Sequence, residues 1–255
     1  MIVTTKEELE ILREGGKRLA YMLDELKSMV APGVSTGTLE EMARALIAAR
    51  GDTPAFLGYT PAGSGRPFPA ALCVSINEVI VHGIPNEKPR NIKEGDVVTL
   101  DLGLIHEGLI VDAAVSTIAG AGSEEDLRLV RAVYEALDAS ISRARTGNTT
   151  GDIGRAVQAV GEKHDLKSPR ELGGHGVGKS VHEEPFVPNW GKPGTGVKLK
   201  EGQVLAIEPM FAIGSAEVKL LEDGYTYVTK DGSRTAQVEH TVVVGKDGAE
   251  VLTKT

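Results

Sequence analysis

The feature of this 255-residue chain that most constrains its fold is a set of acidic residues inside apolar segments. They stand in VVTLDLG (Asp101), GLIVDAAVS (Asp112), QVLAIEPMF (Glu208) and AQVEHTVVV (Glu239). A carboxylate in an apolar interior is very costly unless it is paired or binds a cation. One such acid fits an edge strand that faces water, whereas four predict a shared site that compensates their charge.

The spacing of the two aspartates predicts a hairpin. The midpoint between Asp101 and Asp112 falls between residues 106 and 107. A two-residue turn there would set the two carboxylates opposite each other, with Cβ atoms about 5 Å apart, and a bulge at Gly108 would loosen this geometry. Like charges this close require a cation between them, although a solvent-exposed pair on an edge hairpin fits the same pattern.

A nitrogen donor for such a site is His175, in GGHGVGKSVHEEP. The flanking glycines let the backbone approach a ligand closely. A single histidine is more often a hydrogen-bonded structural residue, but beside four misplaced acids it completes a set suited to Mn, Fe(II), Co or Zn. The sequence therefore predicts two divalent ions about 3.5–4 Å apart, which clamp a water and lower its pKa.

Size, charge and cysteine content limit the class of protein. At 41% hydrophobic content, 255 residues fit one large domain or two small ones. A net charge of -8 and a pI near 5.4 disfavour nucleic acid and anionic membranes as partners. Cys73 is the only cysteine, no secretory signal opens the chain and no apolar run reaches about 18 residues. We therefore expect a cytoplasmic protein without a membrane span.

Hydrophobic periodicity predicts two helices in each half of the chain. One runs from residue 5 to about residue 30, and the next is capped by Thr36 or Thr38, with Glu40 favouring its start. The second half is similar: EELEILR resembles EEDLRLVR, and PGVSTGTLEEMARAL resembles TGNTTGDIGRAVQAV. Any two amphipathic helices share such features, but a duplication predicts a pseudo-twofold architecture.

Short segments rich in β-branched residues predict strands at residues 97–105, 109–118, 203–207, 225–229 and 237–244. Residues 65–69 and 188–197 are too rich in Pro and Gly for a helix or a strand. The combination predicts an α+β fold in which helices cover the outer face of an antiparallel sheet.

A phosphate-binding motif competes with the metal-site interpretation. Residues 173–180 match GxxxxGK[ST], and VVTLD resembles the acidic strand that holds magnesium in P-loop nucleotide hydrolases. That loop must leave an apolar strand and enter a helix. Here KHDLKSPREL precedes the motif, and Pro185 and Pro188 prevent a long helix after it. The context therefore argues against a nucleotide hydrolase.

The order of five motifs resembles that of type I methionine aminopeptidases, over nearly the whole chain: SINEVIVHGIP, VVTLDLG with a second Asp eleven residues on, GGHGVGKSVHEEP, AIEPMF and AQVEHT. The resemblance implies the pita-bread fold, in one catalytic domain with related halves of about residues 1–120 and 121–255. It also implies removal of the initiator methionine when the second residue is small.

Two alternatives share this fold. Xaa-Pro-type aminopeptidases use the same kind of ligand set, but they usually carry an extra N-terminal domain that this chain lacks. A metal-free binding protein would be expected to have lost ligands, and all five are present.

The resemblance also assigns roles to the five ligands. Asp101 resembles the bidentate ligand of one ion, and His175 and Glu208 resemble ligands of the other. Asp112 and Glu239 resemble the bridging carboxylates. The implied cofactor is two divalent ions per chain, which are Co, Mn, Fe or Zn.

Two further histidines match the family pattern. His82 in VHGIP and His182 in SVHEEP resemble the non-ligand histidines that contact the substrate and the tetrahedral intermediate. Histidine suits this role because modest shifts bring its proton exchange near neutral pH. Glu208 is implied to move a proton from the water toward the leaving amine. Without the family, each histidine would be an ordinary loop residue.

The wall of the methionine pocket resembles, by position, apolar and aromatic residues of this chain: Tyr59, Phe68, Cys73, Val181, Tyr225 and Phe56. Such side chains suit an unbranched thioether, although each alone fits an ordinary core residue. The sequence departs from the family in a longer segment between Tyr59 and Phe68, in Val181 where a larger aromatic is common, and in Tyr225 where Trp is common. These departures concern substrate preference at the rim of the pocket.

The implied substrates are nascent polypeptides and peptides with an N-terminal methionine. The resemblance also implies that the enzyme associates transiently with the ribosome. We expect a monomer that does not contact membranes. The acidity of the chain makes docking on ribosomal RNA by charge alone less obvious.

Overall fold

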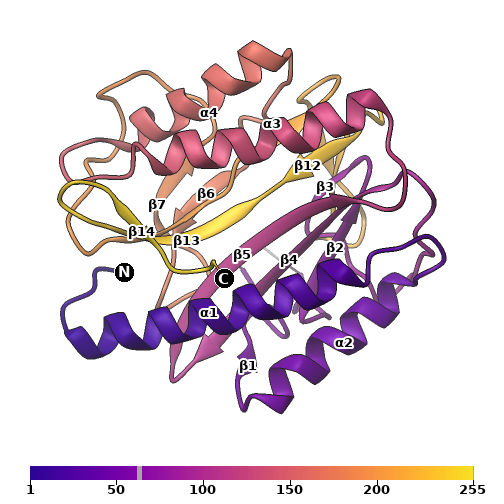
Figure 1. Cartoon of the computed structure of the whole chain (residues 1–255), viewed down its shortest axis with the longest axis horizontal. Helices are drawn as coiled ribbons and strands as arrows, with labels where there is room; N and C mark the ends of the chain where they lie inside the picture. Colours follow the sequence, from indigo (N-terminus) through magenta and orange to yellow (C-terminus); the bar gives the residue numbers. More distant parts are fainter. Residues whose placement is uncertain (62–64, 255) are drawn as a thin grey trace.

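Helices cover one face of an antiparallel sheet in the computed structural model, which describes residues 1–61 and 65–254 (Figure 1). The helices are α1 (Lys6–Ser28), α2 (Thr36–Ala49), α3 (Glu124–Ile141) and α4 (Thr150–His164). Figure 1 shows α1 and α2 over one half of the sheet and α3 and α4 over the other, so the α+β class and the pseudo-twofold arrangement are confirmed. No helix in the described ranges is long and apolar enough to cross a bilayer.

The strands form one large sheet with smaller sheets beside it. Their bounds are β1 (Thr53–Pro54), β2 (Leu72–Ile76), β3 (Val79–Val81), β4 (Val97–His106), β5 (Leu109–Ile118), β6 (Gly173–Gly176), β7 (Glu183–Pro188), β8 (Val204–Ile207), β9 (Met210–Ala212), β10 (Val218–Leu220), β11 (Tyr227–Thr229), β12 (Thr235–Gln237), β13 (Glu239–Val244) and β14 (Ala249–Val251). The large sheet has the order β1-β4-β5-β13-β8-β6-β7, with β2 paired to β4 and β14 to β13. The predicted strands correspond to β4, β5, β8, β11 and β13, and the sequence patterns do not predict the other, mostly short, strands.

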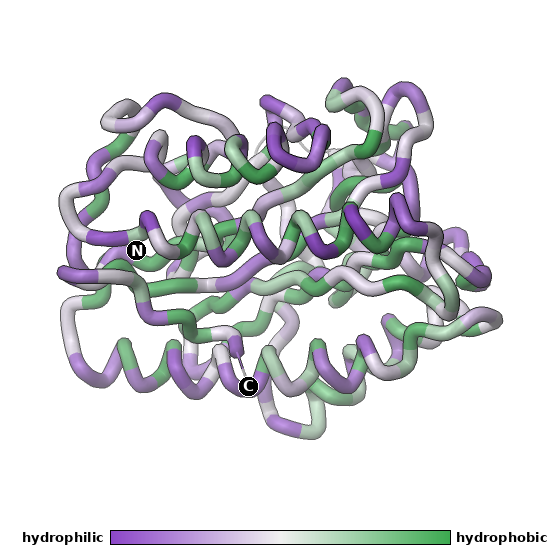
Figure 2. Tube along the Cα trace, turned by 45° about the horizontal axis from the view of Figure 1, so that its top comes forward, coloured by the Kyte–Doolittle hydropathy of each residue, from purple (hydrophilic) through white to green (hydrophobic). Residues whose placement is uncertain are grey.

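The side chains of strand β4 show the two faces of the large sheet, one of which packs against the helices while the other carries the acids. Val98, Leu100 and Leu102 belong to the same buried cluster as Leu19 of α1. Successive side chains of a strand point to opposite faces, so Asp101 points away from the helices. A second buried cluster joins α3 and α4 to β8 and β13. Figure 2 shows hydrophobic and hydrophilic residues alternating along the helices, as expected for elements with one face on the sheet.

The β4–β5 hairpin corrects the register expected for the two aspartates. Its two-residue turn is at residues 107–108, whose φ angles of 45° and 82° are those of a type I′ turn. The turn lies one residue further along than predicted, so Asp101 pairs with Ala114 and Asp112 pairs with Gly103. The two carboxylates are therefore diagonal neighbours on one face, not directly opposite each other.

The start of α2 corrects two further expectations. The N-cap is Ser35, and not Thr36 or Thr38. Glu40 does not serve the helix start, because its carboxylate accepts the backbone N–H groups of residues 71 and 72, each at 2.8 Å. A buried carboxylate with two backbone donors instead fixes the beginning of β2 against α2.

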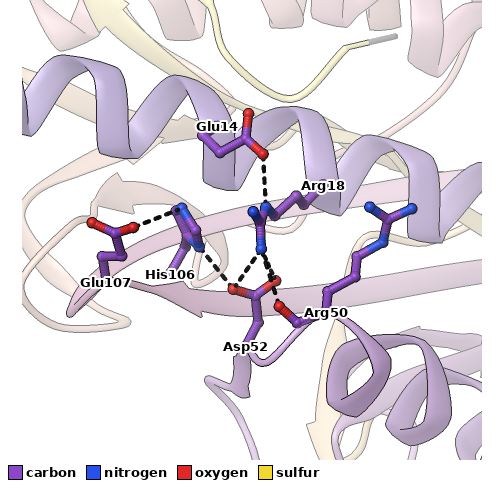
Figure 3. A network of polar contacts seen from close by, with 6 residues as sticks. All are labelled: Glu14, Arg18, Arg50, Asp52, His106 and Glu107. Atoms are coloured by element: carbon purple, nitrogen blue, oxygen red, sulfur yellow. Dashed lines mark hydrogen bonds and ion pairs between the residues drawn. The ribbon is translucent and has the colours of Figure 1, made fainter.

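A polar network ties α1 to the β4–β5 hairpin and to the segment before β1 (Figure 3). The Asp52 carboxylate lies 2.7 Å from Nδ1 of His106 and 3.3 Å from Nη1 of Arg18. Arg18 also donates to Glu14 at 2.8 Å and to the carbonyl of Arg50 at 3.1 Å. The Asp52 side chain is only 3% exposed, so these partners offset most of the cost of burying its charge.

Replacing Asp52 with asparagine is expected to lower the free energy of unfolding by about 1–3 kcal/mol, because a buried charge-assisted contact to Arg18 and His106 is lost. Guanidinium unfolding followed by circular dichroism measures the change. The exposed pair of Glu10 and Arg13 is the control, and Glu10→Gln should change the stability by less than about 0.5 kcal/mol. Equal effects of the two substitutions would show that the network does not stabilise the fold.

Candidate metal centre and active site

The five predicted ligands lie on the face of the sheet that points away from the helices. Asp101 on β4 and Glu239 on β13 are both paired to Ala114, which lies between them on β5. Further along the sheet, His175 of β6 pairs with Ala206 of β8. Directly paired residues point to the same face, and because these partners are alanines the polar side chains have space around them.

Glu208 and Glu239 stand opposite each other at a break between paired strands. β8 pairs with β13 before this point and β9 pairs with β12 after it, in one continuous register that sets residue 208 opposite residue 239. Pro209 has no N–H to donate, so the ladder is interrupted at the two glutamates.

The ligand atoms of Asp112, His175 and Glu239 all lie within 4.8 Å of one another, and all three residues are buried. Glu208 adjoins this group, with its Oε1 3.7 Å from Nε2 of His175. Asp101 is a diagonal neighbour of Asp112 on the same face of the β4–β5 hairpin. The structure therefore brings together all five side chains that the sequence singles out.

The tautomer of His175 suits a metal ligand. Its Nδ1 lies 2.9 Å from the carbonyl oxygen of Gly176, which can only accept a hydrogen bond. The proton is therefore on Nδ1, and Nε2 presents its lone pair toward Glu208. Burial, followed by the neighbouring His182, lowers the pKa of His175 to about 3, so the ring is neutral at pH 7. Support of the second ring nitrogen by a carbonyl is usual for histidines that bind metals.

The four acids are buried together. Burial, and then repulsion from Asp112, raises the pKa values of Asp101, Glu208 and Glu239 well above the usual range. Burial raises the pKa of Asp112 to about 7. Among the residues that the structure describes, no Lys or Arg forms an ion pair with any of these four acids. The one basic side chain within ion-pair distance of them is His175, which is neutral.

Several oxygen atoms of this group have no hydrogen-bond partner. They are Oδ1 of Asp101, Oδ1 of Asp112 and Oε1 of Glu239, and all are buried. Unpaired buried acceptors are rare in folded proteins, because each loses its hydration without compensation. Carboxylates with a neutral imidazole are a ligand set for divalent ions, and bound cations would supply both the missing charge and the missing contacts. The residues therefore fit a metal centre.

Neighbouring polar residues that the sequence analysis does not single out hold the ligands in place. Gln237 donates from Nε2 to Oε2 of Glu208 at 3.0 Å. The Thr241 hydroxyl accepts the N–H of Asp112 at 2.8 Å and donates to its carbonyl at 2.7 Å. Gln237 lies two residues before Glu239 in an apolar segment, so the strand alternation that marks the acids also marks it.

The five ligands line a cavity of about 360 Å³ together with the other predicted site residues, which are His82, His182, Tyr59, Phe68, Cys73, Val181, Tyr225 and Phe56. On its apolar wall, the rings of Phe68 and Tyr225 meet edge to face at 5.1 Å. Leu220 and Tyr227 also line the cavity. Sequence reasoning misses them because their local pattern does not differ from that of ordinary strand residues.

The two non-ligand histidines are neutral at pH 7. His82 follows β3 with a φ of 60°, which is uncommon for a residue other than glycine. Burial lowers the pKa of His82 to about 4, and it also lowers the pKa of His182. The ring of His182 stands edge-on to that of His175, with 4.5 Å between centroids. Both histidines can therefore accept or donate a hydrogen bond in the cavity.

The segment that matches the phosphate-binding motif has a different structure. Residues 173–176 form β6, and the next element is β7, not a helix. The Glu183 carboxylate accepts the N–H groups of Lys179 at 2.6 Å and Ser180 at 2.9 Å. A phosphate would need these donors and would meet a negative charge, so the structure disfavours the nucleotide-hydrolase alternative.

A ligand set for divalent metal in the wall of a partly apolar cavity is typical of a metal-dependent hydrolase. The model of metallopeptidase family M24 matches residues 10–246. The chain is 46% identical to the methionine aminopeptidase of Aquifex aeolicus, over 98% of this chain and 97% of the relative. It is 39% identical to methionine aminopeptidase 1 of Bacillus subtilis, over 100% of this chain and 99% of the relative.

A solved structure gives the same answer. The crystal structure of the methionine aminopeptidase from Thermotoga maritima matches with a TM-score of 0.94 and 40% identity, over 100% of both chains. The chain therefore belongs to metallopeptidase family M24, among the type I methionine aminopeptidases, and the pita-bread fold is confirmed. Membership of this family implies that it binds divalent metal.

Proposed function

We propose that this chain removes the N-terminal methionine from peptides and newly made proteins with a small second residue, using two divalent ions held by its five buried ligands. The observation that carries the proposal is the convergence of four uncompensated carboxylates and one neutral imidazole on a cavity with an apolar wall. The family supports divalent metal. The number of ions, and the choice among Co, Mn, Fe and Zn, belong to the proposal.

In this proposal Asp101 would hold one ion and His175 and Glu208 would hold the other, while Asp112 and Glu239 would be ligands shared by both. The central place of Asp112 supports a bridging role. Its ligand atom lies within 4.8 Å of those of His175 and Glu239, and it is a diagonal neighbour of Asp101 on the same face of the β4–β5 hairpin. When bound, the ions supply a water nucleophile of lowered pKa and polarise the carbonyl of the bond that is cleaved.

Three side chains are proposed to act on the substrate and the water. His182 donates a hydrogen bond to the oxygen of the scissile carbonyl as negative charge develops there. His82 contacts the substrate backbone. Glu208 accepts the proton that the water releases and passes it to the leaving amine, while Gln237 holds its other oxygen.

The apolar wall is proposed to hold the methionine side chain. Its members are Tyr59, Phe68, Cys73 and Tyr225, with Val181 and Phe56 beside them. A flexible, polarizable thioether fits an irregular pocket of aromatic and aliphatic groups. Burial, and then the nearby carboxylates, raise the pKa of the Cys73 thiol, so it stays neutral and adds to the apolar surface.

The alternatives on the same fold are less supported. Relatives that match at 37–46% identity over the full chain are methionine aminopeptidases, which disfavours an Xaa-Pro-type aminopeptidase. A metal-free binding protein is disfavoured because all five ligands are present and converge. We further propose that the chain acts as a single-domain monomer in the cytoplasm and meets nascent chains in transient contact with the ribosome, because initiator methionine first becomes accessible there.

Release of methionine from Met-Ala-Ser and Met-Leu-Ser peptides tests the proposed function. We expect Met-Ala-Ser to be cleaved about 10–200-fold faster, because the larger second residue must fit against the cavity rim. A chelator should abolish cleavage, and added Mn or Co should restore it. Equal cleavage with and without chelator would contradict the metal centre, and cleavage of Ala-Pro-Ser in place of Met-Ala-Ser would favour the Xaa-Pro alternative.

A further inference from the structure

The Tyr59 hydroxyl makes a contact that a pocket-wall residue does not need. It lies 2.9 Å from Nδ1 of His182. The two ring centroids are 5.4 Å apart and the ring planes are tilted by 55°, so the rings are not stacked. The hydrogen bond at the edge of the imidazole is therefore the specific feature of this pair.

The direction of this hydrogen bond follows from the chemistry of the two groups. A phenol O–H is a stronger acid than the N–H of a neutral imidazole, and it can donate to the lone pair of Nδ1. Burial raises the pKa of Tyr59, so the hydroxyl keeps its proton at neutral pH. Once Nδ1 of His182 accepts, the single proton of the neutral ring is on Nε2.

We propose that Tyr59 is a positioning residue, which holds His182 in the tautomer that carries its proton on Nε2 and can therefore donate to the carbonyl oxygen of the substrate. In the other tautomer Nε2 would present a lone pair to the developing negative charge and would repel it. The inference rests on the proposed role of His182 in the reaction.

His175 provides a comparison within the same cavity. The Nδ1 atom of His175 meets a carbonyl, so that ring keeps its proton on Nδ1 and offers a lone pair from Nε2. The Nδ1 atom of His182 meets a hydroxyl, so that ring offers an N–H from Nε2. Two imidazoles 4.5 Å apart thus present opposite groups, one suited to a cation and the other to an oxyanion.

The backbone fixes where the Tyr59 hydroxyl lies. The N–H of Tyr59 donates to the carbonyl of Phe56 at 2.9 Å, and its own carbonyl accepts the N–H of Phe68 at 2.8 Å. The Tyr225 hydroxyl donates to the carbonyl of Arg66 and also lies 3.3 Å from the carbonyl oxygen of Tyr59.

Nitrogen-15 NMR of the histidine rings tests the tautomer without relying on catalysis. Zinc-loaded protein is suitable because Zn²⁺ is diamagnetic, and the His182→Asn variant identifies the signals of that ring. We expect Nε2 of His182 to be protonated in the unmodified protein and Tyr59→Phe to shift the ring toward the other tautomer. The His175 signals should not change. A His182 ring protonated on Nδ1, or unaffected by Tyr59→Phe, would overturn the proposal.

Kinetics test whether the tautomer matters for turnover. Tyr59→Phe should lower kcat for Met-Ala-Ser about 10-fold and change KM less than about 3-fold. In a His182→Asn background the same substitution should have no further effect, because the group through which it acts is gone. Tyr21→Phe removes a hydroxyl from the exposed side of α1 and is the control.

The opposite kinetic pattern would contradict the positioning role. If Tyr59 served only as pocket wall, Tyr59→Phe would raise KM, and it would do so equally with His182 present or replaced. Failure of the proposed function gives a different result. In that case no form of the protein releases methionine, while the NMR signals still decide the tautomer.

Discussion

Replacing His175 with alanine should reduce methionine release from Met-Ala-Ser by more than about 1,000-fold, because one ion loses its only nitrogen ligand. Asp112→Ala should have an effect at least as large, because a carboxylate proposed to bridge both ions is lost. Peptide release and the zinc content of the purified variants measure the effect. Normal metal-dependent activity in either variant would refute the assigned ligands.

The fold should survive these substitutions. In the metal-free protein Asp112 is an uncompensated buried acid. Its removal therefore relieves its repulsion of Asp101, Glu208 and Glu239. We therefore expect metal-free Asp112→Ala to unfold at the same guanidinium concentration as the unmodified metal-free protein, or at a higher one. A large loss of stability would mean that the residue is structural.

A second buried histidine gives the matched control. His106 is buried like His175, but it contacts Asp52 in the network that anchors α1. His106→Ala should lower the free energy of unfolding by about 1–3 kcal/mol and leave the peptide turnover of the folded protein unchanged. His175→Ala should give the reverse pattern. If both variants lost activity and stability together, burial alone would explain the two residues.

The metal-free protein should lose stability as the pH rises above about 6.5. The acids of the site have raised pKa values in the folded state, about 7 for Asp112 and well above the usual range for Asp101, Glu208 and Glu239. The folded chain thus keeps protons that the unfolded chain has released near pH 4. Each retained proton lowers the free energy of unfolding by about 1.4 kcal/mol per pH unit until the pH passes its folded-state pKa.

Below about pH 6.5 the buried histidines change the free energy of unfolding in the opposite direction to the acids. The pKa values of His82 and His175 are lowered to about 4 and about 3, so the unfolded chain binds more protons at these positions below about pH 6.5. Their contribution to stability is therefore lost as the pH falls. The two sets of groups offset each other below pH 6.5, and only the acids act above it.

Guanidinium unfolding at pH 6.5, 7.5 and 8.5 measures this loss, with and without zinc. Zinc should reverse the trend, because it binds the deprotonated ligands of the folded chain and its stabilisation grows with pH. Asp112→Asn should make the metal-free profile less steep. A metal-free profile that is flat or rises between pH 6.5 and 8.5 would show that the acids are not protonated together in the fold.

Much of the site can be identified from the sequence because its residues break local rules. An acid such as Asp101 or Glu239 inside an apolar segment conflicts with burial, and this conflict is visible in a window of seven residues. His175, which lies among glycines, can be interpreted as a metal ligand only together with those acids. The helices and long strands were also predictable, because their apolar spacing is local. Gln237 followed from the same alternation and was missed.

The register of the hairpin was not predictable from spacing. A turn centred one residue further along is equally compatible with the apolar pattern, because it shifts every pair by two residues and keeps each side chain on the same face. The turn at residues 107–108 places Gly108 at one of the two positions that need a positive φ, whereas a turn at residues 106–107 would have no glycine at either. The sequence pattern places Glu40 at the start of its own helix, whereas in the structure its carboxylate binds Arg44 of the same helix and two backbone N–H groups that lie 31 and 32 residues away.

The sequence by itself determined which side chains need compensation, because the cost of burying a charge depends on the residue and its immediate apolar neighbours. Only the tertiary structure decided which of them meet and with what geometry. Asp112 is held by Thr241, 129 residues away, and the tautomer of His182 depends on the hydroxyl of Tyr59, which lies 123 residues away in the sequence. Such contacts arise from strand pairing and packing between distant segments, which no local pattern encodes.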